Sequence, residues 1–279
     1  MELQALLDRA MVLADEGDWD QMAQLLREHL LEHEAEAEVH CWLGVAEREL
    51  GLEGVAYERF RRALALNPED PYVLATAGNG VAAFDDPDAE VALRTASLIA
   101  PDVALTRLMY GAWLAREGFA ADGLRELTAA RALDPDDPQI AYELGVARYL
   151  SGDLEGAADA MGEATSLEPE DGWGRIVMGL VLLEADRLEE ALGELTEGAQ
   201  LHPEDVEAQL AAALAAAATG AEDLAYGMLE RARIRAADED SELLLDVEER
   251  VDLGPEAARA LLMEELAPDM LRRRAQVRP

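Results

Sequence analysis

Small residues and prolines recur along this chain at intervals of 34 residues. Pro135, Pro169 and Pro203 are spaced in this way, and so are Gly111 and Gly145. A fixed period of this length indicates a repeat architecture, in which each unit buries its apolar face only against its neighbours. The period constrains the fold more than any other feature of the sequence.

Rows of 34 residues beginning at Leu3 align the chain as an array. The rows are 3–36, 37–70, 71–103, 104–137, 138–171, 172–205 and 206–239, and the third is one residue short. The eighth position of every row is glycine or alanine, and the twenty-fourth is always a larger apolar residue. A glycine near position fifteen divides five of the rows into two helical stretches. Five rows have proline at position thirty-two, where it ends the second stretch: Pro68, Pro101, Pro135, Pro169 and Pro203.

The small and large positions of a row predict how its two helices pack. Small residues allow helix backbones to approach closely where they cross, and the large residue at position twenty-four fills the space between them. This pattern resembles the tetratricopeptide repeat over residues 3–239. The resemblance implies an all-α fold, a right-handed α-solenoid of about seven helix-turn-helix repeats with a C-terminal helical cap.

The last part of the chain departs from the period. We expect the repeat array to occupy residues 1–240, a degenerate helical pair or cap to occupy 241–268, and a basic tail to occupy 269–279. The tail contains four arginines: Arg272, Arg273, Arg274 and Arg278. It either docks on the acidic body of its own chain or of a second copy, or forms a solvated end.

The charge balance limits the class of partner. The chain has 60 acidic and 23 basic residues, every basic one an arginine, for a net charge of −37. Such a field repels nucleic acid and anionic membranes and favours basic partners. A GC-rich genome or adaptation to high salt would produce a similar composition without any basic partner.

The cysteine content and the hydropathy of the chain predict the cellular compartment of the protein. Cys41 is the single cysteine, so no intramolecular disulfide is expected. The first residues lack the pattern of a signal peptide, and the longest apolar run, 210–218, is too short to span a bilayer. We therefore expect a cytoplasmic protein.

Three features resemble catalytic or cofactor sites, and each has a structural explanation. Residues 29–33, HLLEH, fit a zinc-peptidase motif but lack a third ligand. Residues 78–83, GNGVAA, fit a dinucleotide fingerprint but lie within a helical period. Cys41 falls on an inner helix face, where a packing role is expected. We expect no metal, no cofactor and no enzymatic activity.

The resemblance also implies where a partner binds. In tetratricopeptide proteins the first helix of each pair lines a concave groove. Carried over to this chain, the groove positions are Arg48, Tyr72, Asn79, Leu105, Leu108, Arg116, Tyr142, Tyr149, Trp173 and Ile176. An apolar strip rimmed by acids would suit a peptide or helix that is apolar with basic flanks.

These positions leave several functions open. The alternative for the groove residues is that they pack against the neighbouring repeat. The function expected is that of a protein-interaction scaffold or adaptor. An assembly or secretion chaperone for an apolar, basic client and a self-assembling, homo-oligomeric scaffold are the alternatives.

Overall fold

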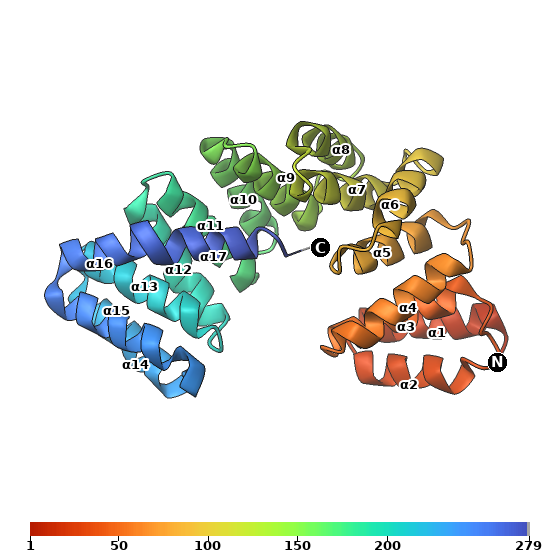
Figure 1. The fold of residues 1–279 in the computed structure, drawn as a ribbon, viewed down its shortest axis with the longest axis horizontal. Coiled ribbons are helices and arrows are strands. Elements are labelled where there is room, and N and C mark those ends of the chain that lie inside the picture. Colours follow the sequence, from red (N-terminus) through yellow and green to blue (C-terminus); the bar gives the residue numbers. More distant parts are fainter. Residues whose placement is uncertain (278–279) are drawn as a thin grey trace. The chain divides into compact units, whose positions relative to one another are not determined.

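The computed structural model describes residues 1–277, apart from the side chain of Glu239. The described residues form helices joined by short turns, and no strand occurs among them (Figure 1). The chain divides into two compact units, Met1–Asp134 and Pro135–Val277. The prediction of an α-solenoid built from helical repeats is confirmed.

Unit 1 consists of four helix pairs, each helix packing against the next along the chain. The pairs are α1 (Leu3–Asp15) with α2 (Trp19–His29), α3 (Ala37–Glu49) with α4 (Glu53–Ala65), α5 (Pro71–Ala82) with α6 (Asp88–Ile99), and α7 (Ala104–Arg116) with α8 (Ala120–Leu133).

Unit 2 repeats this arrangement three times and then changes it. Its pairs are α9 (Pro138–Leu150) with α10 (Leu154–Leu167), α11 (Gly172–Glu184) with α12 (Leu188–Leu201), and α13 (Val206–Ala218) with α14 (Glu222–Arg235). A 3₁₀ turn (Asp238–Asp240) then leads into α15 (Ser241–Leu253). The last described elements are α16 (Pro255–Leu261), a π-helical turn (Leu262–Leu266) and α17 (Ala267–Arg274).

The turn within each pair requires a left-handed backbone. Gly17, Gly51, Gly118, Gly152 and Gly220 all have positive φ. The amide of the residue after the glycine closes the turn by a hydrogen bond to the end of the first helix. In the first pair, the Asp18 amide donates to the Leu13 carbonyl at 2.9 Å. The two rows without this glycine use Asp85 and Asp186, with φ of 54° and 58°. Aspartate tolerates this conformation better than most side chains, so the turn geometry is kept.

The expected contact between positions eight and twenty-four is present in both units. A Cβ added to Gly111 would lie 2.8 Å from the Leu127 side chain, and one added to Gly179 would lie 2.7 Å from that of Leu195. The first helix therefore lies directly against the large side chain of the second. Because this face of the first helix is used for packing within the pair, its opposite face is left to form a different surface.

Aspartates begin several of the first helices. Asp70 accepts a hydrogen bond from the Tyr72 amide at 2.7 Å, and Asp205 accepts one from the Ala208 amide at 2.9 Å. Asp137 and Asp171 cap α9 and α11 in the same way. Part of the acidic excess thus stabilises the helix N-termini.

The boundaries expected after residue 240 need correction. The helix that begins at Pro255 continues through the π-helical turn to Arg274, past the expected cap boundary at 268. Residues 269–274 are therefore part of a helix, not a separate tail. Pro268 lies at the second position of α17, where the wider turn preceding it accommodates a residue without an amide hydrogen.

Phe60 supplies the first test of this packing. Its ring lies between Gly44 of α3 and Gly80 of α5, and a Cβ on Gly80 would overlap it. Overpacking of this kind costs about 1–3 kcal/mol, which exceeds the gain of ~1 kcal/mol in helix propensity. We expect Gly80→Ala to lower the free energy of unfolding by about 1–2 kcal/mol in urea denaturation.

Gly54→Ala is the matched control. Gly54 is an exposed helical glycine with nothing within 4 Å of an added Cβ. This substitution should raise stability by about 0.5–1 kcal/mol. Equal effects of the two substitutions would contradict the role given to Gly80.

Cys41 is a buried packing residue of α3. Its side chain is 3% exposed and its Sγ lies 4.0 Å from the Val73 carbonyl oxygen. Burial, reinforced by the negative charge of Asp70, raises the pKa of the Cys41 thiol to about 12. Little thiolate, the nucleophilic form, is therefore present at neutral pH.

We expect the Cys41 thiol to resist a disulfide reagent such as DTNB at pH 8. The folded protein should release almost no thionitrobenzoate over an hour, whereas the denatured protein should release one equivalent within minutes. Rapid reaction of the folded protein would show that α3 opens easily or that the thiol is more accessible than its burial indicates.

Candidate functional site

The candidate site is a surface of unit 2 formed by α11 and the start of α13, together with Tyr142 of α9. We call this surface the inner face. Trp173 lies in the first turn of α11, and its Nε1 donates to the Tyr142 hydroxyl at 3.2 Å. Asp205 and Glu207 lie at the N-terminus of α13. The inner face thus combines aromatic side chains with two carboxylates.

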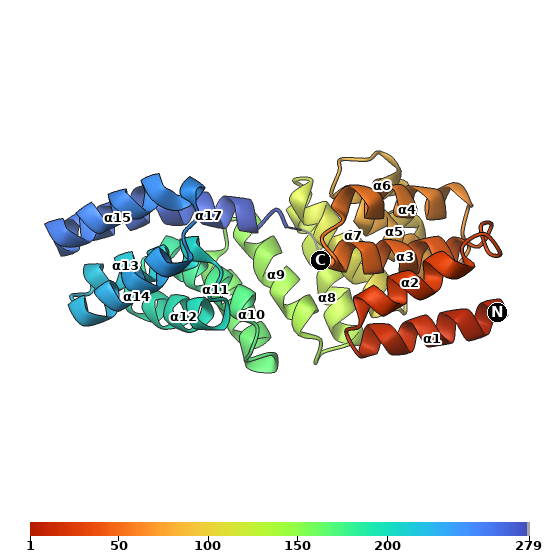
Figure 2. The same cartoon turned by 90° about the horizontal axis from the view of Figure 1, so that it is seen from below.

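α17 lies on this face. It packs against α11, beside which it runs in Figures 1 and 2, while α16 packs against α13. Ala267, Met270, Leu271 and Arg274 of α17 are buried. Met270 and Leu271 belong to the same hydrophobic cluster as Leu180 and Leu210 of the first helices. The last helix of the chain therefore covers part of the inner face.

Arg274 makes the main polar contacts between α17 and the inner face. Its Nη2 lies 2.7 Å from Asp205 Oδ2 and 3.6 Å from Glu207 Oε2. Its guanidinium carbon lies 4.7 Å above the centre of the Trp173 ring. Arg274 is only 6% exposed, so these charges attract one another with little screening by water.

Asp205 serves two partners at once. Its Oδ1 caps α13 through the Ala208 amide, and its Oδ2 accepts from Arg274. The site is therefore built on a carboxylate that the helix already requires. A basic group bound here therefore pairs with the Asp205 carboxylate, which helix capping already holds in place.

The other tail arginines differ in their environments. Arg273 pairs with Glu207 at 2.5 Å and with Asp269 at 3.0 Å. The pairs with Glu207 and Asp269 raise the pKa of Arg273. Arg272 is exposed and pairs with Asp269 of its own helix at 3.2 Å. Arg278 lies outside the described residues. Of the two expectations for the tail, docking on its own chain is the one observed.

Several candidate groove residues belong instead to the core. Asn79 and Leu108 are each 3% exposed, and Ile176 is fully buried. The expectation that they face a partner is wrong for this conformation, because they lie on the sides of the first helices that pack against neighbouring helices. Tyr142 is 9% exposed and contributes its hydroxyl to Trp173.

The remaining candidates are at least partly accessible. In unit 1, Tyr72 is 52% exposed, Leu105 is half-buried, and the Arg116 Nη1 donates to the Ala112 carbonyl at 3.2 Å. Arg48 Nε lies 3.5 Å from Glu49 Oε1.

Tyr149 of unit 2 is half-buried, and the charge of Arg272 in α17 affects its pKa. Burial raises the pKa of Tyr149, Glu184 adds to this effect and Arg272 opposes it. Tyr149 packs against the hydrophobic cluster that also contains Tyr142.

The sequence motifs with catalytic resemblance have structural roles. His29 ends α2 and its Nδ1 lies 3.2 Å from Glu32, whereas His33 Nε2 lies 2.9 Å from the Met1 carbonyl oxygen. The two histidines therefore have different partners. Residues 78–83 continue α5 and its C-terminal cap as expected. Within residues 1–277, no group of three or more potential ligands is arranged to hold a metal ion.

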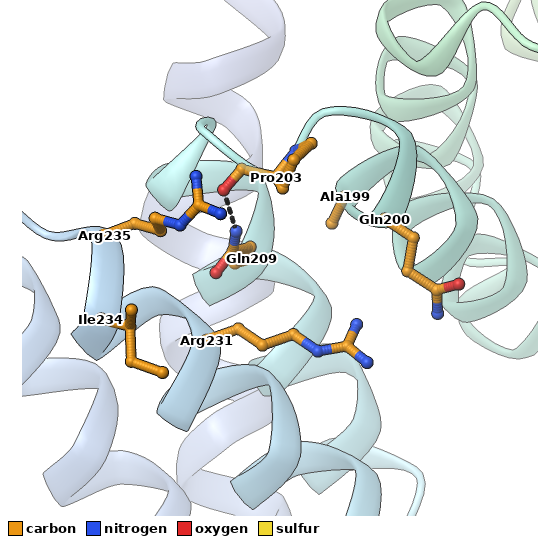
Figure 3. A pocket seen from close by; sticks show the side chains of 7 residues that line it. All are labelled: Ala199, Gln200, Pro203, Gln209, Arg231, Ile234 and Arg235. Carbon is orange, nitrogen blue, oxygen red and sulfur yellow. Dashed lines mark hydrogen bonds between the residues drawn. The ribbon is translucent and has the colours of Figure 1, made fainter.

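A shallow pocket lies between α12, α13 and α14. It is lined by Ala199, Gln200, Pro203, Gln209, Arg231, Ile234 and Arg235 (Figure 3). Gln209 Nε2 donates to the Pro203 carbonyl at 2.5 Å, and Arg235 pairs with Glu204. The polar ends of Gln200 and Arg231 lie away from Gln209 (Figure 3). These groups do not converge on a common point, so the pocket lacks the features of a ligand site.

Sequence reasoning missed Met270, Leu271 and Asp205. The signal for α17 was present, because Leu262, Leu266 and Met270 follow one another at four-residue intervals across Pro268. The expected boundary after residue 268 placed Met270 in the basic tail, apart from Leu262 and Leu266. Asp205 lay outside the groove positions that the repeat family supplies.

Comparison with known proteins is consistent with this architecture. Residues 114–171 match the model of a tetratricopeptide repeat family. No curated protein matches the sequence. Among the helices of residues 1–277, none has both the length and the apolar character needed to cross a bilayer.

Solved structures of low sequence identity share the fold. The Cut9–Hcn1 hetero-tetramer of the APC/C is similar at a TM-score of 0.71 and 19% identity, over 90% of this chain and 49% of that one. This chain thus spans about half the length of the matched one. TTC0263, a tetratricopeptide-repeat protein of Thermus thermophilus, is similar at a TM-score of 0.53 and 23% identity, over 64% of this chain and 98% of that one. PilF of Pseudomonas aeruginosa is similar at a TM-score of 0.53 and 18% identity, over 72% of this chain and 91% of that one.

The matched model, these similar structures and the 34-residue pattern agree on one assignment. Residues 114–171 are tetratricopeptide repeats, and residues 1–277 have the fold of tetratricopeptide-repeat proteins.

Proposed function

We propose that this protein is a non-catalytic interaction scaffold that binds an apolar, basic segment of a partner protein at the inner face of unit 2. One observation carries the proposal: the inner face already accommodates a helix of this chemistry. Met270 and Leu271 supply its buried apolar contacts, and Arg274 supplies the charge paired with Asp205. A surface that buries such a helix has the shape and charge to bind another.

The character of the whole chain supports a protein partner. With a net charge of −37, the chain repels polyanions and attracts basic segments. The accessible candidates of unit 1, Tyr72, Leu105 and Arg116, are proposed as a further contact surface of that unit. A reducing compartment such as the cytoplasm suits a chain whose single cysteine is a buried thiol.

Affinity capture from the source cell tests this proposal. Because Arg274 of α17 pairs with the same carboxylates, all proteins in this comparison carry Arg274→Gln. The tagged Arg274→Gln chain would be compared with the same chain that also carries Asp205→Asn/Glu207→Gln, which removes two charges without changing side-chain shape. Asparagine caps helices about as well as aspartate, so α13 should remain intact. We expect the variant to retain at least about tenfold less of the partner, measured by quantitative mass spectrometry.

A matched control is Glu168→Gln/Glu170→Gln. Both residues are exposed in the turn before α11, and the same number of charges is removed. The control should retain the partner fully. Equal capture by all three proteins, or capture of no protein by the Arg274→Gln chain, would contradict the proposal. Capture of the chain by itself would favour the self-assembling alternative.

A further inference from the structure

α17 makes contacts of the kind that a bound ligand makes. It contributes two adjacent buried apolar side chains, Met270 and Leu271, and a buried arginine three residues later. The arginine stacks on an aromatic ring and pairs with two carboxylates at the start of another helix. Aromatic and arginine contacts of this kind dominate the energetics of protein interfaces.

The fit of Arg274 is incomplete. Its Nη1 is buried, and no hydrogen-bond partner for it occurs in residues 1–277. A buried donor without an acceptor reduces the net stabilisation from docking, because that group has lost its water. A segment that also satisfied this donor would therefore bind the inner face more tightly than α17 does.

Among the described elements, α17 packs mainly on α11 and on the π-helical turn that precedes it. The π-helical turn Leu262–Leu266 before α17, and Pro268 at the second position of α17, interrupt the regular hydrogen bonding. On the other side of this interruption, α16 stays attached through the buried residues Ala258 and Leu261 and through its packing on α13 and α15. The π-helical turn is thus the natural hinge.

A stripe of buried side chains explains why the π-helical turn lies at this place. Leu262, Leu266, Met270 and Arg274 are spaced by four residues, whereas an α-helical turn takes about 3.6. A strictly α-helical segment would rotate this stripe away from α11 over three turns. The wider π-helical turn compensates for the rotation and keeps α17 on the inner face.

We propose that α17 is a built-in competitor for the inner face. The partner that displaces it is a basic helix with two adjacent apolar residues followed, three residues later, by an arginine. This inference rests on the proposed function and specifies both the chemistry of the partner and the control of its access. In the absence of such a partner, α17 covers Trp173, Asp205 and Glu207.

Tethering makes the competition effective. A segment joined to its site by a short connection experiences an effective concentration of about the millimolar range. A free helix must exceed this advantage or fit better than α17 does. The inner face is therefore closed to weakly matched segments and accessible to well-matched ones.

A peptide-binding experiment on the full chain tests the competitor. The probe is a fluorescein-labelled peptide with the sequence of residues 262–277. The released variant, Leu271→Asp/Arg274→Gln, places a charge at a buried apolar position and removes the arginine contact. We expect it to bind the peptide at least tenfold more tightly than the wild type does, measured by fluorescence anisotropy.

Two controls isolate the mechanism. Arg272→Gln removes one charge from the same helix, but at a side chain that is 69% exposed, and should bind the peptide as weakly as the wild type. A probe peptide with the Arg274→Gln substitution should bind the released variant about tenfold more weakly than the unchanged probe. Circular dichroism should show the helix content of the wild type in Arg272→Gln, and in the released variant a loss no larger than the eight residues of α17.

Equal binding by the wild type and the released variant would overturn the proposal, as would no binding by a folded released variant. Wild-type dimers that exchange α17, detected by light scattering, would overturn it in favour of a second copy as the occupant. This test is separate from partner capture. If partner capture depends on Asp205 and Glu207 but the peptide does not bind, the scaffold function stands and the competitor does not.

Discussion

The close approach of the two helices in each pair is the constraint on which the rest of the structure depends. A glycine on the first helix meets a large side chain on the second, as at Gly145, where an added Cβ would lie 2.5 Å from the Met161 side chain. A larger residue at the glycine position would separate the helices and shift every later pair. Because this contact uses one side of the first helix, the other side is left to contact different groups. In unit 2, α11 and the start of α13 form the inner face in this way.

Charge on the inner face follows from the same architecture. Each first helix of unit 2 begins immediately after a turn, and an aspartate there satisfies amide groups that have no partner within the helix. Asp205 fills this role in α13 and also pairs with Arg274. Its negative charge is thus fixed by helix capping before any ligand is considered. An arginine that docks at this position interacts with a carboxylate that is already oriented, which lowers the entropic cost of binding.

The fold could be predicted from sequence because every row repeats the same physical requirement. The turn glycines, the small positions and the punctuating prolines are visible individually and reinforce one another. Even the substitutions of Asp85 and Asp186 for glycine preserve the left-handed turn. The site was less predictable because α17 lies outside the period and has no equivalent row to compare with. Positions such as Leu108 and Ile176 were assigned by analogy, and analogy does not distinguish a side chain facing the groove from one facing the next helix.

The covering of the inner face has a physical reason apart from regulation. If α17 were undocked, Met270 and Leu271 would be exposed, and the aromatic face beneath them would meet water. Docking buries both surfaces, so a covered inner face protects the free protein from non-specific association. The same argument limits how tightly α17 can be held. If its contacts were complete, no partner could compete with a tethered helix, and the Nη1 of Arg274, which has no acceptor within residues 1–277, leaves room for a better ligand. Protection and access therefore require an occupant of intermediate fit, and α17 has that character.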